Sequence, residues 1–417
     1  MNRSIVVLSS ALLTFSTGLP AEPEVLDLAA LLAEAERAHP GIRAQVERAA
    51  AAAEVAPRVE APPDPELSVS YTNDGLDELT LGTSQFSNVT VRWDQDLPRK
   101  SVRKGSAEVA RREESVVLAQ ATNLRAEVRR RTIEAYAGIW RADREHDLLA
   151  EGRTVLVASL EAARARYEAG QGAQEGLLRA QTELRRADLE LETASRQRRG
   201  AEIALLEALG RDGDAKLGPA LTLPPVEAPA AEELERAVGV GPELRVATAE
   251  VERAGAATER ARAATKTEWG FMAAYQYLGS LDPMVMGGVT VKLPLWRSSK
   301  QAREVAEAEH TAQAVALEKE AAQNTAVARA RDLLAEIDSI RRQRALLDEA
   351  LIPEGIATLE AARAGYGAGR AEMGVVLDDL TRLLGDRRRL AALSAREVIA
   401  AAELERITGL AILGGAR

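Results

Sequence analysis

The stretch LEAARARYEAG at residues 160–170 returns as LEAARAGYGAG at residues 359–369, with nine of eleven positions identical and a shift of 199 residues. Such self-similarity at a long interval indicates a duplicated structural unit. Each copy precedes a Leu-rich helical segment, at residues 175–191 and 375–393, and follows a Val-Thr-Val stretch that begins at 89 or 289. The chain is therefore expected to form two halves with the same order: helix, two strands, very long helix, turn, helix.

The chain divides into four expected segments. Residues 1–21 have the features of a secretion signal: Arg3 is basic, residues 5–15 are apolar, and cleavage is expected after Ala21. The first repeat spans 22–216, a Pro-rich extended linker spans 217–230, and the second repeat spans 231–417. No Cys stands at the cleavage site, so we expect no lipid anchor there. No later segment is apolar enough over about 18 residues to form a transmembrane helix.

The composition favours long helices over compact globules. Aromatic residues make up only 3% of the chain, whereas Ala, Glu, Arg and Leu dominate. The formal net charge is -10, and no basic stripe is interleaved with aromatics, so nucleic acid is not an expected partner. The absence of cysteine excludes disulfides, thiolate chemistry and Cys-ligated zinc.

Heptad spacing predicts two long antiparallel helical hairpins. Residues 99–218 contain no proline, so a first helix of some 70 residues, about 105 Å long, is expected to end near Gly170. Its apolar seam is expected at every seventh residue: Ala121, Val128, Ala135, Ala142, Leu149, Leu156 and Ala163. The returning helix carries a Leu/Ala seam at Leu177, Ala180, Leu184, Ala187, Leu191 and Ala194. The seam of the second copy is expected at Leu333, Ile337, Ile340, Leu347 and Leu351.

Four short segments alternate between apolar and polar residues and are expected to form strands. Their apolar positions include Tyr71, Trp93, Trp269, Phe271, Tyr275, Tyr277, Val289 and Val291. One interpretation is a small soluble sheet packed on the helices. The other is an outer-membrane barrel, in which these residues face the lipid. Four strands cannot close a barrel, because open sheet edges are not tolerated in hydrocarbon, so several chains would have to share one.

The duplicated order, the Tyr-x-Ala-Gly tips and the run QDLPRKSVRKGSAEVA from Gln95 resemble the outer membrane efflux proteins of the TolC family. The resemblance covers nearly all of the chain after the signal, and residues 350–384 are its most specific part. The Gln-Asp-Leu-Pro run with basic residues after it is similar to the branch that serves heavy-metal cation pumps. That branch has Gly-Lys after the proline, where this chain has Arg99-Lys100-Ser101.

The resemblance implies a mainly α fold with a small membrane β part. It implies a homotrimer in the outer membrane whose chains each give four strands to a twelve-stranded barrel, with long helical hairpins forming a hollow periplasmic coiled-coil barrel. The channel would be the passive conduit of a tripartite efflux system, opened at its periplasmic tips. Its expected partners are outer-membrane lipid, a periplasmic adaptor (membrane fusion protein) and an inner-membrane pump, with the resistance-nodulation-division type as one candidate.

The resemblance also assigns site residues. Tyr366 stands where the family has a tip tyrosine that holds the closed state, and Asp378 stands where it has a pore-facing constriction carboxylate. We expect Asp379 to share that role and Arg370 to pair across the entrance. A ring of carboxylates would attract cations and repel anions. The expected adaptor contacts are the tip residues Ala169, Gly170, Ala368 and Gly369.

Two other function classes fit the sequence less well. A periplasmic adaptor or coiled-coil scaffold would have the signal and the helices, but an adaptor carries one hairpin flanked by β-rich domains. An enzyme is not expected, because no catalytic constellation is visible. Glu36 with His39 and Glu307 with His310 have the E-x-x-H spacing of di-metal sites, but this spacing is weak in a chain so rich in Glu. We therefore expect no metal and no cofactor.

Overall fold

A computed structural model describes residues 25–213 and 216–414, so the expected signal segment lies outside the described residues. The first half contains α1 (Leu28–Ala38), α2 (Pro40–Ala53), α3 (Val55–Glu60), β1 (Glu66–Thr72), β2 (Asn88–Leu97), α4 (Lys100–Glu168) and α5 (Gln174–Leu209). The second half contains α6 (Ala231–Val238), α7 (Pro242–Ala263), β3 (Glu268–Tyr277), β4 (Met284–Lys292), α8 (Gln301–Leu346), a π-helical turn η1 (Leu347–Leu351), α9 (Ile352–Gly367) and α10 (Met373–Thr408). This order confirms the mainly α, duplicated fold class.

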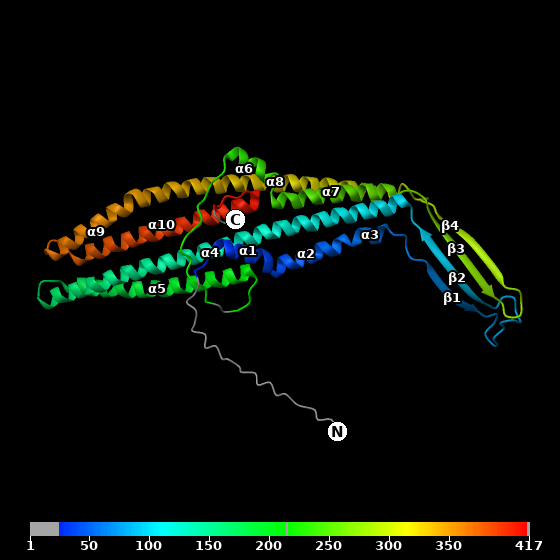
Figure 1. Cartoon of the computed structure of the whole chain (residues 1–417), viewed down its shortest axis with the longest axis horizontal. Helices are drawn as coiled ribbons and strands as arrows, with labels where there is room; N and C mark the ends of the chain where they lie inside the picture. The colour runs from blue at the N-terminus through cyan, green and yellow to red at the C-terminus, as the bar shows by residue number, and fades with distance from the viewer. Residues whose placement is uncertain (1–24, 214–215, 415–417) are drawn as a thin grey trace, which may run out of the picture.

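The helices lie side by side in an elongated layer, with the sheet at one end and two hairpin tips at the other (Figure 1). α4 contacts α2 and α3 near the sheet, α5 near the tips, and α7 and α10 on its other side. α8 in turn contacts α7 and α10. α4 has 69 residues, which corresponds to about 104 Å. The expected length of the first long helix is therefore confirmed.

The heptad seams position the helices within this layer. All seven predicted seam residues of α4 are buried, and α5 and α10 both have 36 residues. In the second hairpin Leu333, Ile337, Ile340 and Leu347 are buried, but Leu351 is 47% exposed, so its prediction was wrong. The reason is η1, because a π-turn inserts a residue into the helix and rotates the following side chains by roughly 100°.

The four strands form one antiparallel sheet in the order β1-β2-β3-β4. The sheet projects beyond the helices (Figure 1), and of the residues in these four strands only Gly270 and Ala274 are buried. The alternative of a sheet packed on the helices is therefore excluded. Within the described part of the chain, no helix is long and apolar enough to cross a membrane.

The largest apolar core lies at the middle of the molecule, where α1, α4, α5, α6, α8 and α10 meet. Residues 216–230, which precede α6, cross this region without a helix or strand, apart from an isolated bridge between Val226 and Leu413. Tyr136 on α4 donates its hydroxyl to the Thr222 carbonyl at 2.8 Å, and Gly414 N donates to the Pro225 carbonyl at 2.9 Å. The connection is therefore fixed to the helices and to the C-terminal segment. A second core fills the space between the hairpins near their tips.

Candidate functional site

The two hairpin tips are built alike. Gly170 and Gly369 both have positive φ, at 70° and 73°, a conformation that glycine adopts without steric cost. The same hydrogen bonds close both turns: Gln171 N donates to the Arg166 carbonyl at 2.9 Å, and Arg370 N donates to the Gly365 carbonyl at 2.8 Å. The two donors, Gln171 and Arg370, are 199 residues apart in the sequence, and so are the two acceptors, Arg166 and Gly365. Ala169, Gly170, Ala368 and Gly369 are all exposed.

Arg166 connects the two tips. Its guanidinium lies over the Tyr366 ring, 4.8 Å from the ring centre, and Nη1 donates to the Tyr366 carbonyl. Among the hydrogen bonds of the described residues, none involves the Tyr366 hydroxyl, whereas its carbonyl accepts from Arg166. The contact between the hairpins therefore uses the tyrosine ring and backbone, and the sequence reasoning missed Arg166.

A second cross-link lies farther along the same helices. Arg179 Nη2 on α5 donates to Asp378 Oδ1 on α10 at 2.7 Å. The two residues are separated by 199 positions, the repeat interval, so they are equivalent positions of the two copies. Opposite charges at equivalent positions were a sequence signal that could have revealed this pair. Asp378 remains half exposed.

Between the tips is a cavity of about 320 Å³. Both bridging arginines line it, together with Glu175, Tyr366, Gly369 and Glu372, among others. The other predicted gate residues lie differently. Arg370 is exposed and its side chain has no ion pair in the described chain, whereas Asp379 is buried and 3.6 Å from Arg382. Asp379 therefore offers little exposed carboxylate, unlike its neighbour Asp378.

The strand pairing places the predicted apolar positions on one face. Trp93 pairs with Leu67 and Ala273, Tyr275 pairs with Val91 and Val285, and Phe271 pairs with Val289. Because paired residues point to the same side of a sheet, all four apolar sets share a face. Trp269 and Phe271 are near the helices, Tyr71, Tyr275 and Tyr277 are near the far end, and Trp93 lies between them, level with Ala273 in the middle of β3. Each of these rings is at least 40% exposed.

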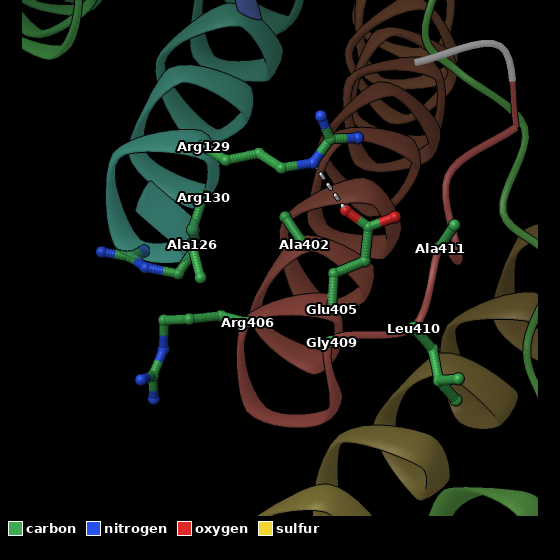
Figure 2. Close-up of a pocket in the computed structure, with 9 residues that line it drawn as sticks. All are labelled: Ala126, Arg129, Arg130, Ala402, Glu405, Arg406, Gly409, Leu410 and Ala411. Atoms are coloured by element: carbon green, nitrogen blue, oxygen red, sulfur yellow. Dashed lines mark hydrogen bonds and ion pairs between the residues drawn. The ribbon is translucent and has the colours of Figure 1, made fainter. Parts of the chain in front are cut away.

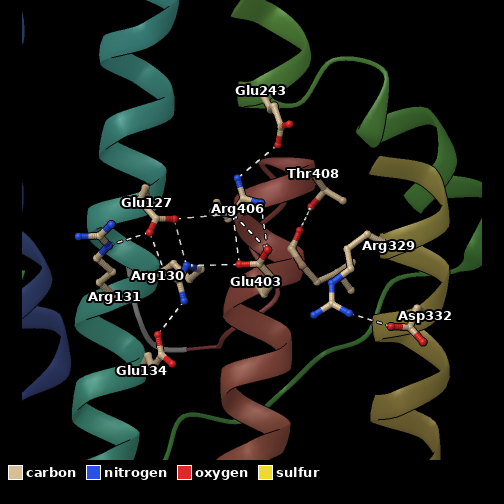
Figure 3. Close-up of polar contacts among 11 residues, drawn as sticks. Glu127, Arg130, Arg131, Glu134, Glu243, Arg329, Asp332, Glu403, Arg406 and Thr408 are labelled. Carbon is tan, nitrogen blue, oxygen red and sulfur yellow. Dashed lines mark hydrogen bonds and ion pairs between the residues drawn. The ribbon is translucent and has the colours of Figure 1, made fainter. Parts of the chain in front are cut away.

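An ionic network crosses the middle of the layer (Figure 3). On α4, Glu127 accepts from Arg130 at 2.8 Å and from Arg131 at 2.7 Å. Arg130 also lies 3.3 Å from Glu403 on α10. Arg406 pairs with Glu403 at 2.9 Å and with Glu243 on α7 at 3.4 Å. Hydrogen bonds from Arg130, and secondarily from Arg131, lower the pKa of Glu127 to about 2.

Beside this network, Glu405 fixes the C-terminal segment. Its buried Oε1 accepts from Ile412 N at 2.7 Å and from Leu413 N at 2.8 Å, and Oε2 accepts from Arg129 at 3.3 Å. Figure 2 shows this contact between Arg129 and Glu405, and both residues line a cavity of about 330 Å³. With these donors, both oxygens of the buried Glu405 side chain have hydrogen-bond partners, as buried polar groups require.

The E-x-x-H pairs do not form a metal site. His39 instead begins α2, where its Nδ1 accepts from Gly41 N at 3.1 Å. Among the described residues, no group of three or more His, Cys, Asp or Glu side chains is arranged to hold a metal ion.

No protein-family model and no curated protein matches the chain. Several solved structures match the chain. CusC superposes with a TM-score of 0.78 at 17% identity, over 94% of this chain and 95% of its own. VceC, an outer membrane protein of Vibrio cholerae, superposes with a TM-score of 0.77 at 19% identity, over 94% of this chain and 97% of its own. The open state of the MtrE outer membrane channel of Neisseria gonorrhoeae superposes with a TM-score of 0.76 at 16% identity, over 94% of this chain and 90% of its own. At these identities, the likeness concerns the fold over nearly the whole chain.

Proposed function

We propose that this chain is one protomer of a trimeric outer-membrane channel, the passive conduit of a tripartite efflux system. The observation that carries the proposal is the four-stranded sheet, which projects beyond the helices and exposes a continuous apolar, aromatic face. A soluble protein rarely exposes so large an apolar patch without a partner. Hydrocarbon is the partner that suits a face of this kind.

The dimensions of the apolar face fit a bilayer. Trp269 and Tyr277 lie at the two ends of β3, eight residues apart, which corresponds to about 27 Å along a strand and, at the tilt of barrel strands, to about 19–22 Å of height between the two Cα atoms. Transmembrane barrels have an apolar band about 25 Å tall between two aromatic girdles, on strands tilted by about 35–45°. The opposite face carries Thr90, Arg92, Asp94, Thr290 and Lys292, which suits a water-filled interior.

The sheet edges require further copies. β1 and β4 each pair on one side only, so their outer edges present unpaired backbone groups. In hydrocarbon every such group must be satisfied, and this is possible only in a closed barrel. Three copies of four strands give twelve, above the minimum of about eight strands known for transmembrane barrels. The helices, arranged as a single layer, would then form the wall of a periplasmic cylinder.

The hairpin tips are the proposed gate. In one chain, Arg166 holds Tyr366 and Arg179 holds Asp378, so two links join the hairpins at the end farthest from the sheet. Opening requires the hairpins to separate, and thus requires both links to break. Asp378, once released from Arg179, would add an exposed carboxylate to the entrance in each of three chains. Arg370, exposed at the tip, would contact a neighbouring copy.

The exposed tip residues Ala169, Gly170, Ala368 and Gly369 are the proposed adaptor contact, chiefly through backbone shape. An inner-membrane pump would load the channel through that adaptor. The names of the similar structures support a channel: MtrE is an outer membrane channel in an open state, and CusC undergoes transmembrane channel formation. An adaptor or scaffold is not favoured, because it would have no use for the exposed aromatic sheet.

Adjacent residues of β4 test the orientation of the sheet. Val289 lies on the apolar face and Thr290 on the polar face. An arginine on the lipid side of a barrel costs about 2–4 kcal/mol at mid-membrane, so Val289→Arg should remove the protein from the outer-membrane fraction. Thr290→Arg should leave it there and still conduct ions in planar bilayers. Equal fractionation of the two variants, or wild-type protein free in the periplasm, would overturn the proposal.

A further inference from the structure

Three of the four junctions between sheet and helices are strongly basic. Residues 98–104 follow β2, residues 260–267 precede β3, and residues 293–303 follow β4. Together they contain ten cations and neither Asp nor Glu, although the formal net charge of the chain is -10: Arg99, Lys100, Arg103, Lys104, Arg260, Arg262, Lys266, Arg297, Lys300 and Arg303. We call these residues the basic belt. The strand order places its three segments next to one another at the end of the sheet that meets the helices.

The belt is almost free of counter-charges within its own chain. Among the described residues, Arg262 is the only belt cation with an ion pair, to Glu259 and Glu309. Arg99 and Arg103 donate to backbone carbonyls instead, and Arg260 donates to Ser106. All belt side chains except Arg103 belong to exposed residues. The remaining junction, before β1, is mixed, because Arg58 is accompanied by Glu60 and Asp64.

Exposed apolar side chains lie within the belt. In the turn after β4, Leu295 and Trp296 are 73% and 71% exposed, and Arg297 follows directly. Trp269 lies on the apolar face of the sheet near the same end. Tryptophan beside cations at the edge of an apolar band is typical of a membrane–water interface, where the ring lies at the headgroup level.

A cavity of about 710 Å³ opens beside the belt. Its walls include Arg58, Arg103 and Arg260, an acidic residue, Asp64, and the prolines Pro62, Pro63 and Pro98. The Nε atom of Arg103 is buried and has no hydrogen-bond partner in the described chain. Guanidinium groups above an apolar wall provide both the charge and the surface that a phosphate bearing a glycerol backbone requires.

We infer that the basic belt binds the head groups of anionic phospholipids in the membrane leaflet on the helical side of the sheet. The inference rests on the proposed membrane location. Each Lys or Arg near an anionic surface contributes attraction that falls off within a Debye length, and ten lie in one band. Trp296 and Leu295 enter the apolar boundary of the leaflet while the cations contact phosphates. The belt therefore fixes the depth of the channel in the membrane.

The test uses full-length protein in neutral detergent micelles doped with brominated phosphatidylglycerol or brominated phosphatidylcholine of the same chains. Bromine quenches nearby tryptophan, so fluorescence reports lipid binding near Trp296. We expect phosphatidylglycerol to quench at a concentration at least roughly tenfold lower, and the difference to shrink in high salt. Because Trp93 and Trp269 also lie on the apolar face, the measurement is made in a Trp93→Phe/Trp269→Phe background. Adding Trp296→Phe to that background should remove most of the lipid-dependent signal.

Two matched variants show whether the belt cations cause the preference for phosphatidylglycerol. The belt variant combines Lys100→Gln, Lys104→Gln, Arg297→Gln and Lys300→Gln, and its preference for phosphatidylglycerol should be clearly smaller than that of the wild type, because six of the ten cations remain. The control changes four exposed arginines of the helices that have no ion pair in the described chain: Arg144→Gln, Arg196→Gln, Arg342→Gln and Arg363→Gln. It should keep the wild-type preference. Equal binding of both lipids by wild-type protein, or equal loss in both variants, would overturn the inference.

Outer-membrane fractionation of the same proteins separates this inference from the proposed function. If wild-type protein fractionates with the outer membrane but shows no lipid preference, the lipid inference fails and the channel stands. If wild-type protein is free in the periplasm, the channel proposal fails and the inference fails with it.

Discussion

At the scale of single residues, the sequence identified one side of each link between the hairpins. Tyr366 and Asp378 were candidates, whereas their partners Arg166 and Arg179 were not. Periodicity shows which face of a helix is apolar, but it does not show which exposed charges meet across two hairpins some 200 residues apart. The duplication itself contained the missing information for one pair, because Arg179 and Asp378 occupy equivalent positions.

Arg166→Ala should open the channel. The substitution removes the contact with the Tyr366 ring and the hydrogen bond to its carbonyl, together worth about 1–2 kcal/mol. The ratio of open to closed channels should then rise roughly 5- to 30-fold in single-channel recordings. Tyr366→Phe is the matched control, since it keeps both ring and carbonyl and should behave as wild type. Opening by Tyr366→Phe alone would show that the hydroxyl forms the link.

Glu127 should make stability depend on pH in acid. Its pKa is lowered to about 2 in the folded chain, so its stabilising effect is complete above its ordinary value of 4.5. That effect is lost as the pH falls from about 4.5 to about 2. Glu127→Gln should therefore lower the free energy of unfolding by about 1–2 kcal/mol at pH 7 and much less at pH 2. Denaturant titrations at both pH values measure this.

The exposed Glu192, which makes no ion pair in the described chain, provides the control. Glu192→Gln should leave the free energy of unfolding unchanged at both pH values. A Glu127→Gln effect of equal size at pH 7 and pH 2 would contradict the assignment of the low pKa to folding.

At the scale of elements, the sequence was most informative where one period continues without interruption. Proline-free heptads predicted the length of α4 and its whole buried seam, and strand alternation predicted the shared apolar face that the pairing shows. The prediction failed at η1. There Pro353 lacks a backbone donor, and the π-turn just before it shifts the helical phase. A single inserted residue in a helix leaves no trace in composition.

Leu347 and Leu351 test this change of phase. Leu347 begins the π-turn and is buried in the seam, whereas Leu351 ends the turn and is half exposed. Leu347→Ala should destabilise the protein by about 2–5 kcal/mol, as buried leucines do, and Leu351→Ala by less than about 1 kcal/mol. The comparison requires denaturant unfolding of both variants. Equal losses would indicate that the heptad continues through η1.

At the scale of the whole molecule, the chain is a layer that cannot close on itself. Apolar seams join neighbouring helices, while the sheet has two open edges and an exposed apolar face. A low aromatic content of 3% fits this architecture, because a layer one helix thick has no deep core to fill. Salt bridges at the middle join α4, α7 and α10 into one wall.

In the proposed channel, three such layers close around one hollow interior. Electron microscopy of detergent-extracted protein from outer membranes tests this closure most directly. We expect a hollow trimer with a helical part about 100 Å long, tapering toward the tips, and a short barrel at the other end. A monomer, or a solid helical rod without a lumen, would contradict it.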